Sequence, residues 1–375
     1  MVTIPPFCPH TGCRYHQGDH RENRFWIRRG FYTRNDSGHR IQRFLCRGCN
    51  RSFSSMSFSL DYTANRRLSY RLLLRLLVSC CGIRATARVL AVSPQTVINR
   101  ISRLARSLSV GHYQLLSYCY LAEPLVLDGL VGFCQSQYHP TNIPLLAGFH
   151  SQFVYLWDYA RVRRSGRMTP EQRRERTRRD RRYPCEPAAE RAAVIRLLCE
   201  AAPLLTARRS PDLRIESDEN TTYPAALRAV PYTASLLYSG TLSHRRTNSQ
   251  LPRTIHNPLF SANYVDRERR KNLAEYVRET TRFGRNANNQ SERFWLFVFS
   301  HNYLTPHRVR IGASTHAEYA GLSEQAIRKV LRVAFTRRVF ASREHLTWAL
   351  SRLWGRERRT PKLPLSVPPP RYVSS

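Results

Sequence analysis

Residues 123–133 read Glu-Pro-Leu-Val-Leu-Asp-Gly-Leu-Val-Gly-Phe, and they place one acid, Asp128, inside an otherwise apolar stretch. A short apolar run of this kind predicts a buried strand. A carboxylate buried there destabilises the fold unless it meets a cation or a metal ion. The alternative interpretation, a solvated carboxylate at a sheet edge, agrees less well with the apolar residues on both sides of Asp128.

A second stretch, residues 213–227, reads Leu-Arg-Ile-Glu-Ser-Asp-Glu-Asn-Thr-Thr-Tyr-Pro-Ala-Ala-Leu and predicts a strand ending at Asp218, then a helix. Two strand patterns and one apolar helix pattern lie between the two stretches, at residues 143–150, 153–163 and 187–202. This alternation predicts an α/β core. Asp128 and Asp218 converge if their strands are neighbours. Otherwise both are solvated carboxylates at strand ends.

Two later acids are candidates for the same cluster, on helices predicted over residues 264–280 and 288–303. Asp266 shares a helix face with Leu273 and Val277, which points it inward. Glu292 is in line with three apolar residues, Leu296, Phe299 and Tyr303. The other acids of the first helix fall on a polar face and are expected to be solvated: Glu268, Glu275 and Glu279.

The N-terminal region contains two cysteine pairs, Cys8-Pro-His-Thr-Gly-Cys13 and Cys46-Arg-Gly-Cys49. The segments FWIRRGFYTR and HRIQRFL between them predict two strands around the turn at residues 35–38. Cysteine pairs that flank a hairpin can place four thiolates tetrahedrally around zinc. The expected ligands are Cys8, Cys13, Cys46 and Cys49.

The sequence leaves alternatives open at this cysteine cluster. His10 or His16 lies close enough in sequence to replace one cysteine. The alternative is a set of ordinary reduced cysteines without a metal. Gly48 is expected to take a positive φ in a tight turn. The other six cysteines show no ligand spacing and are expected to be small buried residues: Cys80, Cys81, Cys119, Cys134, Cys185 and Cys199.

Residues 66–108 predict helices separated by a tight turn. Ser93 followed by Pro94 is a strong helix start, with Ser93 as N-cap. A short helix, a turn and a longer helix form a helix-turn-helix, whose second helix enters the DNA major groove. The residues expected to face DNA are Gln95, Thr96, Asn99 and Arg100. The alternative is a plain helical bundle that links two domains.

Composition favours a nucleic-acid partner. The 375-residue chain has 61 Lys+Arg and 26 Asp+Glu, a net charge of +35, and all but three of the basic residues are arginine. Such an excess attracts a polyanion, although a GC-rich genome also favours arginine. No run of about 18 apolar residues predicts a membrane span. The N-terminus shows no secretion-signal pattern, so we expect a cytoplasmic, nucleoid-associated chain.

The order of these parts resembles that of bacterial insertion-sequence transposases of the acidic-triad (DDE) type. The resemblance covers roughly residues 5–310. It rests on CPHTGC…CRGCNRSFS, the helix-turn-helix, LVLDGLVGF, RIESDENTTYPAAL and NPLFSANYVDRERRKNLAEYVRETTRFGRNANNQSER…SHNY. It implies a ribonuclease-H-like core, which is a mixed sheet flanked by helices, with acids at strand ends and on one late helix.

Carried over by position, Asp128 matches the acid on the first core strand and Asp218 the acid after the fourth. Asp266 matches the third acid, where relatives commonly carry a glutamate followed by arginine, so Glu292 stays an alternative. The wide spacing between the last two acids makes residues 239–258 a candidate inserted loop. The resemblance implies Asp128, Asp218 and Asp266 as catalytic ligands of Mg²⁺ or Mn²⁺, which suit hard oxygen ligands.

The expected organisation is an α+β multidomain chain: a zinc ribbon at 1–62, a helix-turn-helix domain at 63–112, a ribonuclease-H-like core with a mixed sheet at 118–310, and C-terminal helices with a proline-rich tail at 311–375. The expected function is metal-dependent cleavage and strand transfer of transposon-end DNA, by an oligomer assembled on DNA. The alternatives are a non-catalytic regulator or inactive relative, and a structure-specific nuclease. The Arg-rich segment 161–182 either contacts DNA or is a solvated insertion.

Overall fold

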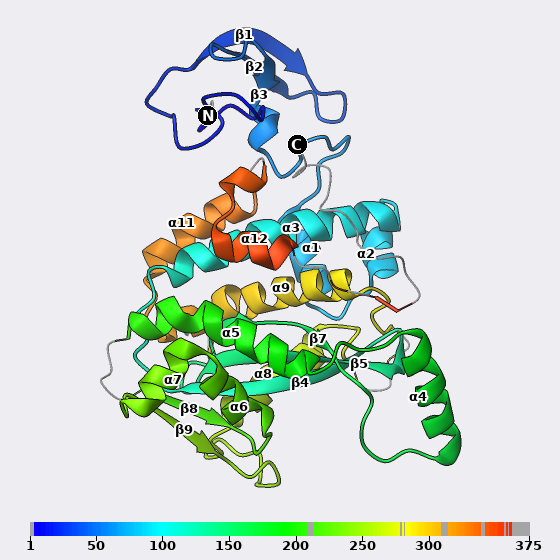
Figure 1. The fold of residues 1–375 in the computed structure, drawn as a ribbon. Helices are drawn as coiled ribbons and strands as arrows, with labels where there is room; N and C mark the ends of the chain where they lie inside the picture. Colours follow the sequence, from blue (N-terminus) through cyan, green and yellow to red (C-terminus); the bar gives the residue numbers. More distant parts are fainter. Residues whose placement is uncertain are drawn as a thin grey trace.

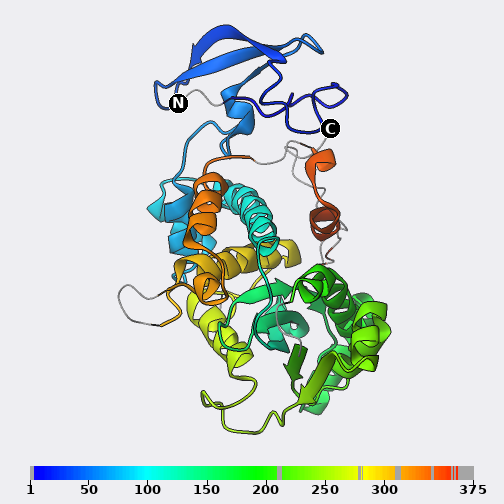
Figure 2. The same cartoon turned by 90° about the vertical axis from the view of Figure 1, so that its left-hand side faces the viewer.

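The computed structural model describes residues 4–208, 213–277, 280, 282–308, 314–338, 342–355, 358 and 360–361. These residues form an α+β structure with a small three-stranded sheet, a six-stranded mixed sheet and twelve α-helices. Figures 1 and 2 both place the small sheet at one end of the molecule and strands β8 and β9 at the other. The predicted α+β class with a mixed sheet is confirmed. The predicted proline-rich tail, 363–375, lies outside the described residues.

The small sheet is the N-terminal hairpin plus one short strand, in the order β1-β2-β3. Its antiparallel strands pair Thr33 with Arg40 across the turn, and Gly38 in that turn has φ +65°. The predicted hairpin is confirmed. A short 3₁₀ segment, Ser55–Phe58, follows the sheet. The strands are β1 (Trp26–Thr33), β2 (Arg40–Cys46) and β3 (Ser52–Ser54).

Three helices connect the small sheet to the rest of the chain. They are α1 (Tyr70–Leu77), α2 (Ile83–Val89) and α3 (Pro94–Leu116). The N-cap prediction at Ser93 is confirmed, because its side chain accepts a hydrogen bond from the amide of Thr96. Helix α3 extends four residues past the predicted boundary at residue 112 and packs against α9 and α11. These helices therefore share one hydrophobic core with the large sheet.

The large sheet has the strand order β6-β5-β4-β8-β9, and β7 pairs with β5. Strand β5 runs antiparallel to β4, β6 and β7, whereas β4, β8 and β9 run parallel. Each predicted core stretch contains a strand, but the stretch 153–163 forms two short strands instead of one. The strands are β4 (Leu125–Cys134), β5 (Ser136–Gly148), β6 (Val154–Trp157), β7 (Ala160–Arg161), β8 (Leu213–Ser217) and β9 (Leu242–Arg246).

Helices cover both faces and one edge of this sheet. Helix α5 packs on β5, β6 and β7, and α8 packs on β4 and β5. The edge strand β6 is covered by α9, whose Asn302 side chain bonds both the amide and the carbonyl of Val154. The helices are α4 (Pro170–Arg182), α5 (Ala189–Thr206), α6 (Thr222–Ala229), α7 (Pro231–Tyr238), α8 (Phe260–Asn272) and α9 (Ala287–Leu304).

The C-terminal region adds α10 (His316–Tyr319), α11 (Glu324–Ala334), a 3₁₀ turn (Arg343–His345) and α12 (Trp348–Gly355). Helix α11 packs on α3, and α12 contacts α3 through the Trp354 indole, which donates to the Ser109 hydroxyl at 3.2 Å. None of the helices that the structure describes is long and apolar enough to cross a membrane.

Three sequence predictions about the region after β8 are wrong. Residues 239–258 are not merely an inserted loop, because residues 242–246 form strand β9 in parallel with β8. The helix predicted over 264–280 ends at Asn272, because the backbone of Leu273 is extended, with φ −110° and ψ 119°. Glu268 and Glu275 are buried rather than solvated, and Glu275 pairs with Arg293 at 2.9 Å. Glu279 lies outside the described residues.

Candidate active site and cysteine cluster

Asp128 and Asp218 lie side by side because their strands pair in parallel. The ladder between β4 and β8 ends with Leu127 opposite Ser217. Asp128 is the next residue of β4 and Asp218 directly follows β8, and neighbouring strands lie about 4.8 Å apart. The two strands are therefore neighbours, which is the condition for the two acids to converge. The register between the strands places the acids side by side, and sequence alone does not provide that register.

Asp266 approaches the same point from helix α8. Side chains alternate between the faces of a strand, so Asp128 shares a face of β4 with Val126. Val126 packs against Leu259 and Ala262 at the start of α8, so α8 covers this face. The negative charge of Asp266, further along α8, acts on the Asp128 carboxyl. The structure thus brings together the three acids that the resemblance singled out.

Two arginines hold Asp266 in place. Arg269 pairs with one carboxylate oxygen at 2.5 Å and Arg270 with the other at 2.7 Å. Arg269 is fully buried and also donates to the carbonyls of Leu130 at 3.3 Å and Val131 at 2.9 Å. The guanidinium therefore ties α8 to β4 and positions Asp266 beside the sheet.

The electrostatics of the cluster disfavour three negative charges without a cation. Burial raises the pKa of Asp128 to about 7, while the hydrogen bond from the Gly129 amide, 2.7 Å long, opposes the shift. The charges of Asp218 and Asp266 raise the pKa further, and Arg253 lowers it. A bound cation would relieve this repulsion and return Asp128 to its ionised form.

Tyr223 is a member of the site that the sequence analysis missed. Its side chain is 1% exposed on α6, and its hydroxyl hydrogen-bonds to the Asp128 carboxyl. Burial, followed by the charges of Asp128 and Asp218, raises the pKa of Tyr223 well above its usual value. Tyr223 therefore stays protonated and acts as a donor. Its sequence signal was weak, because an aromatic residue near a helix start is usually a core residue.

Glu190, in the first turn of α5, connects the surroundings of the two strand acids. Its Oε1 accepts from the side-chain amides of Asn142 at 2.8 Å and Asn220 at 3.0 Å. The backbone amide of Asn220 in turn donates to Asp218 at 2.9 Å. The Asn142 amide lies over Gly129, where a Cβ would come within 2.4 Å of its oxygen. Nothing in the sequence distinguished Glu190, since acids are common in a first helical turn.

Glu292, the other candidate third acid, lies elsewhere. It is 7% exposed between α9 and α3, and its Oε2 accepts from the Ser102 hydroxyl at 2.8 Å. Burial raises the pKa of Glu292 to about 7, and the hydrogen bond from Ser102 partly opposes this. The geometry therefore associates Asp266, and not Glu292, with Asp128 and Asp218.

The donor chemistry of the three aspartates fits Mg²⁺ or Mn²⁺, which prefer carboxylate oxygens. Their spacing is looser than that of a closed metal site. Within the described ranges, the four cysteines are the one group of metal-ligating side chains whose ligand atoms all lie within 4.8 Å of one another. Sharing a cation among all three acids requires the ion pairs of Asp266 to open.

Cys8, Cys13, Cys46 and Cys49 converge at the base of the small sheet. The Sγ atoms of Cys8 and Cys49 are 3.7 Å apart, as are those of Cys13 and Cys46. A tetrahedral zinc with Zn–S bonds near 2.3 Å requires S–S distances of about 3.8 Å. The Gly48 amide points at the Cys46 sulfur at 3.3 Å, which favours a thiolate there. This cluster has the size and chemistry of a zinc site.

The details of this cluster correct two expectations. Neither histidine replaces a cysteine, because His10 bonds the Ser52 carbonyl and His16 bonds the Cys8 carbonyl and the Ser342 hydroxyl. Gly48 does not have the expected positive φ. It is required by space instead, since a Cβ would come within 2.7 Å of the Tyr15 ring.

The residues expected to face DNA on α3 divide into two groups. Gln95 and Asn99 are exposed and bond each other at 3.0 Å, and Thr96 is half-buried. Arg100 is 4% exposed and pairs with Asp61 at 2.9 Å. The prediction for Arg100 is therefore corrected: its guanidinium holds α3 against the segment before α1 and does not lie on the surface.

A scan against protein-family models found no matching family, and a search of curated proteins found no relative.

Proposed function

We propose that this protein is a DNA transposase of the acidic-triad type, with a ribonuclease-H-like core that cuts transposon ends and joins them to target DNA. One observation carries the proposal. Asp128 and Asp218 each directly follow the last register pair of two neighbouring parallel strands, and the charge of Asp266 acts on the Asp128 carboxyl. A DNA-binding regulator has no use for three converging acids, whose mutual repulsion opposes folding.

The core arrangement supports the ribonuclease-H-like proposal. The mixed sheet has helices on both faces, one acid within its first strand, one directly after the strand β8, and one on a later helix. This matches the acid placement that the resemblance implies. Asp128, Asp218 and Asp266 would hold Mg²⁺ or Mn²⁺, which would supply an activated nucleophile and stabilise the leaving oxygen.

The other residues of the site would act through these acids. Tyr223 holds the Asp128 carboxyl by a hydrogen bond, and Asn220 holds Asp218 through its backbone amide. Glu190 restrains Asn142 and Asn220 together. Arg253, whose positive charge reaches Asp128, would help to hold a phosphate near the acids.

The N-terminal region is proposed as the part that recognises transposon ends. The four cysteines would bind a structural zinc ion and make residues 1–62 a zinc ribbon. Helices α2 and α3 would form a helix-turn-helix, with Gln95, Thr96 and Asn99 available to DNA. Joining two ends implies an oligomer on DNA, in the nucleoid of the cytoplasm.

One observation favours the alternative, an inactive relative that only binds DNA. Both oxygens of Asp266 are paired with arginine, which neutralises the third acid without a metal ion. An aspartate also stands where members of the family that the sequence resembles commonly carry a glutamate. The two proposals differ in a single respect, catalysis, and the following experiment decides between them.

The test uses a supercoiled plasmid that carries this gene with its native flanking DNA, so that the element's own ends are present. Wild-type protein is incubated with Mg²⁺ or Mn²⁺, and new ends are mapped by primer extension. We expect cleavage at the element boundaries, and no cleavage with Asp218→Asn. Tight binding to the boundaries without cleavage in either metal would support the inactive relative and refute the enzyme.

A further inference from the structure

We infer that the outward face of α4 binds the phosphate backbone of duplex DNA beside the acid cluster, without reading its sequence. The outward face is defined here as Arg173, Arg174, Thr177, Arg178, Arg181 and Arg182. The placement of the DNA rests on the proposed function, whereas the binding itself does not. This assigns a role to the Arg-rich segment that sequence alone left open.

The composition of α4 favours a phosphate polyanion as its partner. The helix reads Pro-Glu-Gln-Arg-Arg-Glu-Arg-Thr-Arg-Arg-Asp-Arg-Arg, and it buries no residue. It has no apolar face with which to enter a membrane surface or a protein interface. All its cations are arginines, whose planar guanidinium binds phosphate oxygens in pairs. The chemistry therefore selects a phosphate polyanion.

Two acids of α4 pair with arginines on its inner side. Glu175 pairs with Arg179 at 2.5 Å, and Asp180 pairs with Arg163 at 2.8 Å. Arg179 also donates to the Ser136 hydroxyl at 3.2 Å and lies over the Tyr138 ring at 4.9 Å. These contacts fix the helix to the start of β5.

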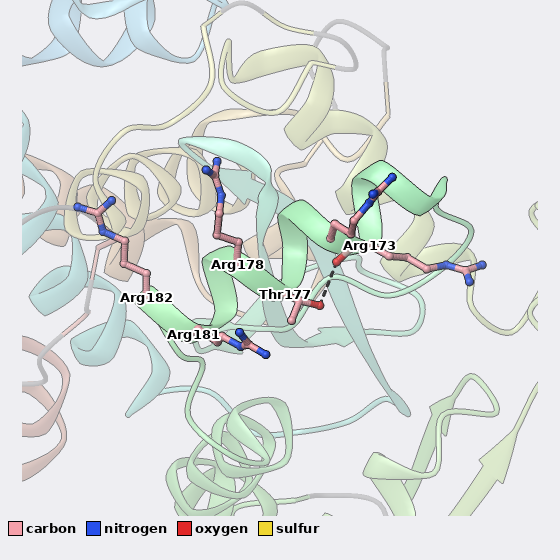
Figure 3. Close-up of a pocket in the computed structure, with 6 residues that line it drawn as sticks. Arg173, Thr177, Arg178, Arg181 and Arg182 are labelled. Atoms are coloured by element: carbon pink, nitrogen blue, oxygen red, sulfur yellow. Dashed lines mark hydrogen bonds between the residues drawn. The ribbon is translucent and has the colours of Figure 1, made fainter.

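The outward face is left with uncompensated positive charge. Within the part of the chain that the structure describes, no acidic side chain pairs with Arg173, Arg181 or Arg182. Arg174 and Arg178 are partly compensated, because Arg174 pairs with Glu171 at 3.4 Å and Arg178 with Glu175 at 2.7 Å. Arg178 and Arg182 stand at i,i+4 spacing, an arrangement of like charges that opposes the helix. Figure 3 shows the labelled arginines projecting from α4 around Thr177 without meeting one another. A bound polyanion removes this repulsion.

Helix α4 lies on the same side of the molecule as the acid cluster and away from the small sheet. Its anchor Ser136 follows the end of β4, eight residues after Asp128, so the two lie about 20–25 Å apart along the strand direction. That distance is about six or seven base pairs at 3.4 Å per step. Figure 1 shows α4 in the half of the molecule away from the small sheet. The outward face thus serves DNA at the acids, not DNA held by the small sheet.

The first test measures binding of a random-sequence 30-base-pair duplex by fluorescence anisotropy over a range of NaCl concentrations. The variant Arg173→Gln/Arg181→Gln/Arg182→Gln is compared with a matched control, Arg328→Gln/Lys329→Gln/Arg332→Gln on α11, which removes the same charge from exposed positions. Each lost phosphate contact reduces the salt slope by about 0.9. The salt slope is the slope of log K against log [NaCl]. We expect its magnitude to fall by about 2–3 in the α4 variant and by less than 1 in the control.

Equal slopes for the two variants, or an α4 slope like that of wild type, would overturn the inference. Circular dichroism and the melting temperature check that both variants fold. A second measurement needs no charge change: Thr177 is replaced by the photo-crosslinker benzoylphenylalanine. We expect ultraviolet crosslinking to bound duplex, and the absence of crosslinks at saturating DNA would overturn the inference.

These readouts are separate from the test of the proposed function. If the wild-type protein binds DNA through α4 but never cuts it, the transposase proposal fails and the α4 inference stands. If it cuts the element ends while the α4 variant keeps the wild-type slope and Thr177 gives no crosslink, the inference fails and the function stands.

Discussion

Replacing Asp128 by asparagine should stabilise the protein at pH 8 in the absence of added Mg²⁺ or Mn²⁺. The pKa of this carboxyl rises from about 4 in an unfolded chain to about 7 in the fold, chiefly through burial. At 1.36 kcal/mol per pH unit, ionisation of Asp128 in the fold costs at most about 4 kcal/mol at pH 8. Asparagine removes the charge and keeps an oxygen that can accept from the Gly129 amide and the Tyr223 hydroxyl.

The sign of the pH dependence follows from the raised pKa. The folded state retains the Asp128 proton to a higher pH than the unfolded state, so the penalty is absent well below pH 4 and complete above pH 7. The stability difference between Asp128→Asn and wild type should therefore fall from about 4 kcal/mol at pH 8 to about 1.5 kcal/mol at pH 5. Urea unfolding at both pH values, followed by tryptophan fluorescence, measures this difference.

Asp36→Asn is a matched control, because the surroundings of Asp36 lower its pKa whereas those of Asp128 raise it. The Arg34 guanidinium holds the pKa of Asp36 well below its usual value, so Asp36→Asn should destabilise the protein at pH 8. Adding 10 mM MgCl₂ should stabilise wild type and leave Asp128→Asn unchanged. Destabilisation by Asp128→Asn at pH 8, or a difference that does not change with pH, would refute the reasoning about the site.

Four further predictions concern other parts of the molecule. Cys46→Ser should release bound zinc, measured by atomic absorption, and lower the melting temperature; unchanged zinc content would rule out the tetrathiolate site. Asp266→Asn should abolish cleavage of element ends whereas Glu292→Gln should retain it, and the reverse pattern would exchange their roles. Glu190→Gln should slow cleavage by about tenfold and leave DNA affinity unchanged in a filter-binding assay, whereas an unaltered rate would remove Glu190 from the site. Burial lowers the pKa of His301 to about 4, so the protein should lose stability as the pH falls from 6.5 to 4, and His301→Gln should lose less in thermal melts; equal losses would contradict this.

Local patterns predicted the parts of this fold that depend on neighbours in the chain. The strand around Asp128, the strand that ends before Asp218 and the helix cap at Ser93 all follow from apolar runs and capping chemistry. Sequence patterns gave wrong predictions of burial where a side chain is covered by a segment far away along the chain. Glu275 looked solvated from its helix position, but Arg293 reaches it from the next helix and keeps it buried.

The candidate site shows the same division. The sequence supplied the residue types: two acids in strand-like stretches, a third on a later helix, and two cysteine pairs around a hairpin. It could not supply Glu190, because the hydrogen bonds that matter come from residues 48 and 30 positions away, Asn142 and Asn220. It also gave no reason to reject Arg100, whose burial depends on Asp61.

The sequence by itself thus determined the charge, the α+β class, the two closely spaced pairs of cysteines and the short list of acids. Each of these depends on composition or on spacing within one element. Only the tertiary structure decided which acids meet. The register between β4 and β8 sets Asp128 beside Asp218, and Arg269 ties α8 to β4 so that Asp266 joins them while Glu292 turns toward Ser102. Register and helix docking are set by the packing of the whole core, which no single segment encodes.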